Sequence, residues 1–120
     1  MARAFQEYVV YQRAHAVALA VYKETTLFPR TEIFGLTSQM RRSAQSIPTN
    51  IAEGSAFDGK EFRRFLGIAL GSATELEYQF ILATDLGYLR PDRSSELQGD
   101  VREVQRMLVA FRQRLLDQAQ

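Results

Sequence analysis

The sequence predicts an all-α protein, and more closely a single domain over residues 1–120 folded as an up-down-up-down antiparallel four-helix bundle. Apolar residues recur at every third or fourth position through four successive segments, as they do on the buried face of a helix. No segment shows the strict alternation of apolar and polar residues that is typical of strands. Short links containing Gly or Pro separate the segments, so consecutive helices are expected to be antiparallel neighbours.

The first helix is expected over about residues 4–28 and carries two adjacent apolar faces. One face holds Val10, Ala14, Val17, Val21 and Phe28, and the other holds Phe5, Val9, Ala16 and Leu19. An apolar arc this broad is more than one hairpin partner covers, so we expect the helix also to meet another subunit. Pro29 should end the helix, because proline has no amide hydrogen and pushes the preceding residue out of the helical region.

The second helix is expected over about residues 36–54. Its apolar stripe consists of Leu36, Met40, Ala44, Ile47 and Ile51, and Thr37 or Ser38 is the expected N-cap. Pro48 falls inside this stripe and removes one backbone hydrogen bond, so we predict a helix that continues but bends there.

The third and fourth helices are expected over about residues 59–86 and 93–118. Asp58 followed by Glu61 resembles a capping box at the start of the third helix, and Gly87 suits a left-handed residue at its end. The apolar faces of the two helices consist of Phe62, Phe65, Ala69, Ala73, Leu76, Phe80 and Ala83, and of Leu97, Val101, Val104, Leu108, Phe111 and Leu115.

Composition and motifs argue against several classes of chemistry. The chain has no cysteine, one histidine (His15) and no Gly-x-Ser-x-Gly motif, so we expect a non-enzyme with no metal site and no cofactor. His15 is interpreted as a structural residue. The longest runs without a charged side chain are half the length of a membrane span, and the N-terminus lacks the pattern of an export signal. These observations predict a cytoplasmic protein without a membrane association.

A polar stripe lies beside the apolar one on the second helix, and the third helix offers a matching line. The two lines define a predicted structural polar network of Gln39, Arg42, Ser46, Asn50, Glu53, Ser72 and Glu75. An antiparallel hairpin predicts an ion pair between Arg42 and Glu75, with Ser46 and Asn50 hydrogen-bonded across the interface.

Basic residues on the same two helices give a functional alternative to that structural interpretation. Arg41, Arg42, Lys60, Arg63 and Arg64 form a candidate nucleic-acid-binding surface that contacts phosphates. The whole chain has a net charge of only +1, which is below the usual range of dedicated nucleic-acid binders, but an oligomer would gather one such patch from each subunit. Both interpretations stay open at this point, for different residues of the set.

Several sequence blocks resemble a known family. The segments FPRTEIFGLTSQMRR at residues 28–42, SIPTNIAEG at 46–54, KEFRRFL at 60–66 and ALGS at 69–72 resemble the bacterial four-helix-bundle family of 23S rRNA intervening-sequence proteins. The residues that carry the match are Gln39, Arg41, Arg42, Ser46, Pro48, Asn50, Glu53, Gly54, Lys60, Gly71, Ser72 and Glu75. Related accessory proteins of diversity-generating retroelements are similar bundles that use a basic surface and associate with RNA.

The resemblance implies a homo-oligomeric ring, a homopentamer, with no established biochemical activity. We expect the subunits to meet through the first and fourth helices, at Phe5, Tyr8, Leu19, Met107 and Leu116. The functional hypothesis is RNA or ribonucleoprotein binding through the basic surface. The alternative is a protein-protein interaction scaffold with no nucleic-acid role.

Overall fold

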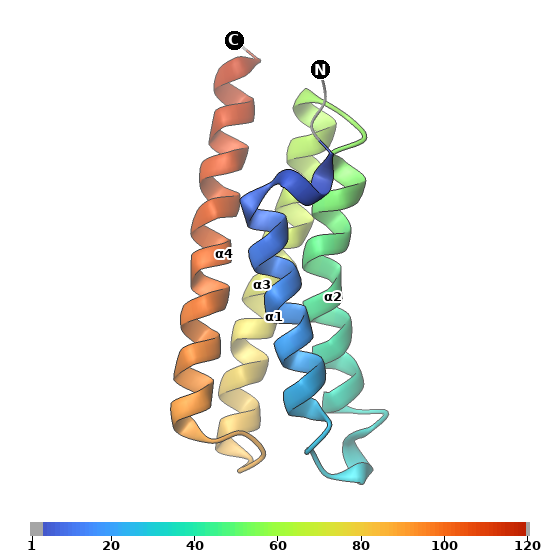
Figure 1. The fold of residues 1–120 in the computed structure, drawn as a ribbon, viewed down its shortest axis with the longest axis vertical. Helices are drawn as coiled ribbons and strands as arrows, with labels where there is room; N and C mark the ends of the chain where they lie inside the picture. The colour runs from blue at the N-terminus through green and yellow to red at the C-terminus, as the bar shows by residue number, and fades with distance from the viewer. Residues whose placement is uncertain (1–3, 120) are drawn as a thin grey trace.

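Four helices run up and down along one long axis in the computed structural model of the protein, which describes residues 4–119 (Figure 1). The helices are α1 (Val9–Thr25), α2 (Leu36–Gly54), α3 (Gly59–Asp85) and α4 (Pro91–Gln118). Two short 3-10 turns, η1 (Phe5–Glu7) and η2 (Arg30–Glu32), precede α1 and α2. No strand occurs within residues 4–119, so the all-α class with four helices is confirmed for that part of the chain.

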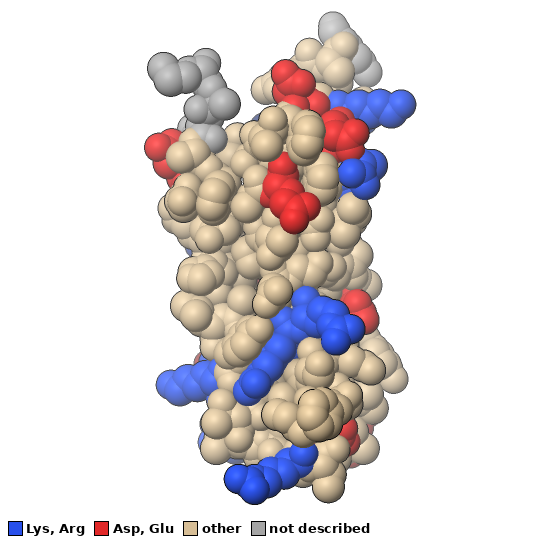
Figure 2. Space-filling view, turned by 90° about the vertical axis from the view of Figure 1, so that its right-hand side faces the viewer, with Lys and Arg blue, Asp and Glu red and all other residues tan. Residues whose placement is uncertain are grey.

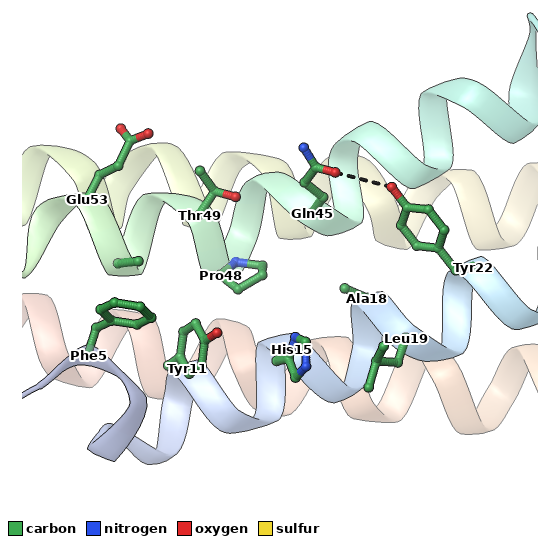
Figure 3. Close-up of a pocket in the computed structure, with 11 residues that line it drawn as sticks. Phe5, Tyr11, His15, Ala18, Leu19, Tyr22, Gln45, Pro48, Thr49 and Glu53 are labelled. Carbon is green, nitrogen blue, oxygen red and sulfur yellow. Dashed lines mark hydrogen bonds between the residues drawn. The ribbon is translucent and has the colours of Figure 1, made fainter.

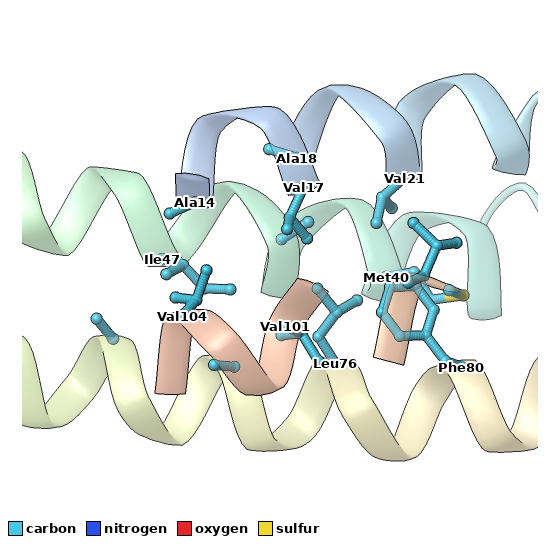
Figure 4. Close-up of a cluster of buried hydrophobic side chains, with 14 of the residues drawn as sticks. Ala14, Val17, Ala18, Val21, Met40, Ile47, Leu76, Phe80, Val101 and Val104 are labelled. Carbon is cyan, nitrogen blue, oxygen red and sulfur yellow. The ribbon is translucent and has the colours of Figure 1, made fainter. Parts of the chain in front are cut away.

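The helices enclose one apolar core, part of which is shown in Figure 4. The bundle measures 48 × 22 × 20 Å. The predicted apolar stripes supply most of this core, but on α3 Leu66 is buried in it and the predicted Phe65 lies outside it. The largest fully buried apolar side chains are Phe80, Met40, Ile47, Ile51, Leu66, Leu76, Leu97, Leu108, Val21, Val101 and Val104. Full burial of one such side chain stabilises a fold by about 1.5–3 kcal/mol. Packing is most extensive between α2 and α3 and between α3 and α4, and sparsest between α1 and α4.

The first helix is shorter than the expected span of about residues 4–28. The backbone is extended at Tyr8, between η1 and α1, and α1 ends at Thr25. The hydroxyl of Thr25 donates to the carbonyl of Val21 at 2.7 Å, and that of Thr26 donates to Tyr22 at 2.9 Å. The two hydroxyls thus bond backbone carbonyls in the last turn of α1, which helps to end the helix before Pro29.

The helix starts differ from the sequence expectations in three places. Gly35, rather than Thr37 or Ser38, precedes α2, and the carboxylate of Glu32 accepts the N–H of Leu36 at 3.1 Å. Asp58 makes no side-chain cap bond at α3, so the predicted capping box does not form. The fourth helix starts at Pro91 rather than at residue 93, because a proline at the first helical position loses no hydrogen bond.

Two glycines lie where helices end, one in the predicted left-handed conformation and the other in close contact with the next helix. Gly87 has φ +81°, which confirms the left-handed residue predicted after α3. Gly54, at the end of α2, is buried against α3, and a Cβ there would lie 2.7 Å from the Cβ of Phe65. The α2–α3 connection therefore depends on the absence of a side chain at this position.

Candidate functional site

Arg41, a candidate phosphate ligand, is half-buried and is bonded within its own chain. Its Nε donates to the hydroxyl of Thr25 at 2.9 Å, and its Nη2 donates to the carbonyl of Tyr22 at 3.4 Å. The guanidinium carbon lies 5.0 Å from the centre of the Tyr22 ring. A cation at the carbonyl end of a helix is stabilised by the helix dipole, so Arg41 caps the C-terminus of α1.

Three further basic residues of the predicted surface are exposed. Arg42 and Lys60 form no ion pair or hydrogen bond with any residue in the described range 4–119. Arg64 forms an ion pair with Glu61 one turn earlier and lies over the ring of Phe65, with its guanidinium carbon 4.6 Å from the ring centre. Arg42 and Lys60 thus have no partner of their own in the described chain.

Arg63 lies beside a second arginine that the sequence analysis missed. The Nε of Arg112, on α4, donates to the backbone carbonyl of Arg63 at 3.3 Å, and the Arg112 guanidinium lies 3.4 Å from the position that a Cβ on Gly67 would take. The Nε of Arg63 is buried without a hydrogen-bond partner. Neither arginine is ion-paired to a carboxylate within residues 4–119. Two guanidinium side chains therefore lie on facing helices without local neutralisation.

The helical register contained a signal for this pair. The α3–α4 turn is centred near Leu89 and Arg90, and counting outward from it sets Gly67 opposite Arg112 and Glu77 opposite Arg102. The ion pair between Arg102 and Glu77, 2.7 Å long, has this register.

The predicted polar network forms in part. The hydroxyls of Ser46 and Ser72 share a hydrogen bond of 2.8 Å across the α2–α3 interface, as predicted. Asn50 donates to the carbonyl of Ser46 at 2.8 Å and to its hydroxyl at 3.0 Å, so its bonds stay within α2 instead of crossing to α3. The seven predicted members thus reduce to three that are bonded to one another.

The predicted ion pair between Arg42 and Glu75 is absent from the described residues, and this expectation was wrong. The helices bring the two side chains to the same level, but both stay exposed. Gln39 and Glu53 are also exposed and have no hydrogen bond in residues 4–119. The face shown in Figure 2 has a band without Lys, Arg, Asp or Glu between charged side chains toward its two ends.

A groove of about 480 Å³ runs between α1 and α2 (Figure 3). We call this the α1–α2 groove; its lining is Phe5, Tyr11, His15, Ala18, Leu19, Tyr22, Gln45, Pro48, Thr49, Ala52 and Glu53. The ring of Phe5 meets that of Tyr11 edge-on at 5.1 Å, and Tyr11 stacks on His15 at 6.0 Å. The hydroxyl of Tyr22 donates to Gln45 at 3.1 Å across one end. His15 is exposed in this row of rings, and its structural role stays a prediction.

The five residues predicted to join subunits are divided between packed and open positions. Tyr8 is half-buried, with its ring 6.1 Å from that of Phe62 and 5.1 Å from that of Phe111. Met107 packs against the core and Leu116 is half-buried, whereas Phe5 and Leu19 line the α1–α2 groove. Leu19 is 59% exposed, so the α1 part of the predicted interface is open in one chain.

Among residues 4–119 there is no cluster of three or more His, Cys, Asp or Glu side chains with the spacing of a metal site. None of the helices in that range is both long and apolar enough to cross a bilayer. Hydrogen bonds from Gln105 and Arg102 lower the pKa of Glu77, and the hydrogen bond to Glu32 raises the pKa of Tyr88. Both shifts arise from contacts that hold helices or turns together.

Comparison with known proteins identifies one family. The family model described as 23S rRNA-intervening sequence protein matches residues 6–110. A similar solved structure, a protein of unknown function from the S23 ribosomal protein family of Bacteroides thetaiotaomicron, superposes with a TM-score of 0.80. The two chains are 25% identical, and the alignment covers 88% of this chain and 96% of the other. A search of curated proteins gave no match.

Proposed function

Because this chain belongs to the 23S rRNA-intervening sequence protein family, we propose that it is a non-enzymatic, homopentameric protein that binds RNA or a ribonucleoprotein. The observation that carries the RNA part is the pair of Arg63 and Arg112 on facing helices, which no carboxylate of residues 4–119 neutralises. Guanidinium groups bind phosphate through two parallel hydrogen bonds, so arginines without a carboxylate partner suit a nucleic-acid backbone.

The proposed oligomer compensates for the low net charge of one chain in RNA binding. Each chain carries a net charge of only +1, so a single subunit should bind RNA weakly. A ring presents one arginine pair from each subunit, together with the exposed side chain of Lys60. Multivalent contact then raises the overall affinity without any new kind of bond.

A binding titration against a structured RNA and a matched DNA duplex, at low and at physiological salt, tests the proposal. We expect saturable RNA binding that weakens steeply as salt rises, because each phosphate contact releases counterions. Replacing Arg63 and Arg112 by Gln together should weaken RNA binding at least tenfold. The control replaces Arg30 and Arg90, two exposed arginines at the opposite end of the bundle, and removes the same charge.

Equal RNA affinities of the two double variants would contradict the role of the arginine pair. Light scattering of the wild-type chain tests the oligomer separately: the proposal requires a mass five times the 13.7 kDa of one chain. Arg112 also packs on α3, so its replacement could destabilise the fold. Thermal unfolding of each variant separates a loss of RNA binding caused by unfolding from one caused by the loss of charge.

The alternative is a scaffold that binds another protein, and one observation favours it. The link between α1 and α2 exposes three large apolar side chains: Leu27 is 82%, Ile33 is 48% and Phe34 is 94% exposed. Apolar groups grouped on a surface are typical of protein contacts. A protein partner that is captured equally well after nuclease treatment, and lost with Phe34→Ser, would favour this function over RNA binding.

A further inference from the structure

One helical stripe and one groove of this chain are left without a partner. The α3 stripe consists of residues spaced four or three apart along the exposed side of α3: Arg64, Ile68, Gly71, Glu75 and Tyr78. Ile68 is 42% and Tyr78 is 58% exposed, which is unusual for two large apolar side chains on one helix face. The α1–α2 groove exposes Leu19 and a row of aromatic rings in the same way.

Gly71 has no packing reason within its own chain. A glycine inside a helix costs up to about 1 kcal/mol relative to alanine. No side chain and no neighbouring helix lies within 4 Å of the position that a Cβ on Gly71 would take. By contrast, Gly54 and Gly67 each have a close neighbour at that position. A close approach from outside the chain would account for the missing side chain at Gly71.

The charges at the two ends of the stripe and of the groove are opposite. The bond between Ser46 and Ser72 fixes the register of α2 against α3. Counting from it along antiparallel helices places Glu53 level with Arg64, and Arg42 level with Glu75, within about one residue. A second copy placed beside the first, with the same end up, brings its Arg64 to the Glu53 end of the groove. The same placement brings its Glu75 to Arg42, which lies just beyond the groove in a hollow that shares Tyr22 and Gln45 with it.

We propose that the α3 stripe of one copy docks into the α1–α2 groove of the next copy. This assignment rests on the proposed homo-oligomer and names the two surfaces that build it, with α3 in place of α4 as the partner of α1. In this contact the notch at Gly71 receives the aromatic side of the groove near His15, and Ile68 lies against Tyr11. The two surfaces differ, so the contact is heterologous, which is the type of contact that builds cyclic rings.

A pair of glycine variants tests this contact. Gly71→Leu fills the notch on the stripe, while Gly99→Leu makes the same change at an exposed helical glycine of α4 that also has open space around it. Both variants should fold, because neither added side chain meets an atom of its own chain. We expect Gly71→Leu to lower the mass measured by light scattering to that of one chain at concentrations where Gly99→Leu keeps the wild-type mass.

The outcomes separate this inference from the proposed function. A monomeric wild-type protein overturns the proposed oligomer and the docking contact together. An oligomeric wild type whose mass Gly71→Leu leaves unchanged overturns only the docking contact, and the oligomer then uses other faces.

Charge reversal provides a second, independent test. Arg42→Glu and Glu75→Arg each place like charges at one end of the proposed contact, so each variant alone should associate at least tenfold more weakly than the wild type. In a mixture, the groove of the Arg42→Glu chain meets the stripe of the Glu75→Arg chain with opposite charges, and the reverse contact is the wild-type one. Mixing should therefore restore larger assemblies. If the two residues acted only within one chain, mixing would restore nothing, and that result would reject the contact.

Discussion

Glu32 joins three parts of the fold through one carboxylate. Its Oε1 accepts the N–H of Leu36 at the start of α2, and its Oε2 accepts the hydroxyl of Tyr88, beyond α3, at 2.9 Å. Gly35 allows this approach, because a Cβ there would lie 2.7 Å from the Oε1 of Glu32. A cap from a residue four positions earlier thus replaces the Ser or Thr cap that the sequence suggested.

Replacing Glu32 by Ala should destabilise the protein by about 1–2 kcal/mol, since it removes the side-chain bond that caps α2. Urea unfolding measures the loss, and Asp100→Ala, at an exposed carboxylate of α4, serves as the control. The hydrogen bond to Glu32 raises the pKa of Tyr88, so the variant should also return the phenol titration, followed by ultraviolet absorbance, toward its ordinary value. An unchanged Tyr88 titration would contradict the bond.

Arg41 and Arg42 are adjacent in sequence but differ in role. Arg41→Ala should lower the free energy of unfolding by about 1–2 kcal/mol, because it removes charge-assisted bonds to the end of α1. Arg42→Ala, at an exposed residue without a partner in residues 4–119, should change it by less than about 0.5 kcal/mol. Equal effects in chemical denaturation would show that Arg41 does not cap α1.

The carboxylate of Glu77 makes part of the stability depend on pH. Bonds from Gln105 and Arg102 lower its pKa below the ordinary value of 4.5 in the folded state. A lowered folded pKa stabilises the fold above the unfolded pKa, and this contribution is lost as the pH falls through the folded pKa. Glu77→Gln should therefore be less stable than wild type at neutral pH, and the difference should shrink below pH 4.5 in thermal melts. A gap that is constant with pH would rule out the linkage.

At the scale of elements, periodicity predicted which segments form helices, but not which residues cap the end of α1 and the start of α2. The stripe on α2, from Leu36 to Ile51, is buried as expected, because its spacing alone decides which side faces the core. The end of α1 depends instead on Arg41, sixteen residues after Thr25, and the start of α2 depends on Glu32. Local patterns carry no record of such caps.

The same distinction holds for the candidate site. The antiparallel hairpin predicted that Ser46 bonds across to the third helix, which is confirmed, but counting residues did not single out Ser72 as its partner. Counting also failed for Arg42 and Glu75, whose long side chains gain little from pairing in water. Arg112 was missed because the fourth helix was not aligned against the third.

A substitution at the junction of α2 and α3 tests how closely these two helices pack. Gly54→Ala should destabilise the protein by about 1–3 kcal/mol, because the added methyl group overlaps Phe65 and Phe62. Gly99→Ala, in open space on α4, should instead stabilise it by up to about 1 kcal/mol through helix propensity. Calorimetric melting of both variants checks the prediction, and a gain of stability in Gly54→Ala would show that the helices stand further apart.

At the scale of the whole molecule, the bundle has two different ends. The start of α1 and the end of α4 lie at one end, together with the α2–α3 turn, while the α1–α2 and α3–α4 links lie at the other (Figure 1). The arginine pair of Arg63 and Arg112 belongs to the first end, and the exposed side chain of Phe34 belongs to the second. The two proposed partners, RNA and protein, therefore approach opposite ends.

Because the two ends of the bundle differ, the two rims of the proposed ring also differ from each other. If all copies stand the same way up, every fused label attached near Ala4 or Ala119 crowds onto one rim, and the other rim keeps its apolar links bare. A bulky fusion at either terminus would then obstruct a ligand of the arginine rim and spare one of the Phe34 rim. Whether a terminal tag blocks binding of the partner therefore indicates which rim the partner occupies.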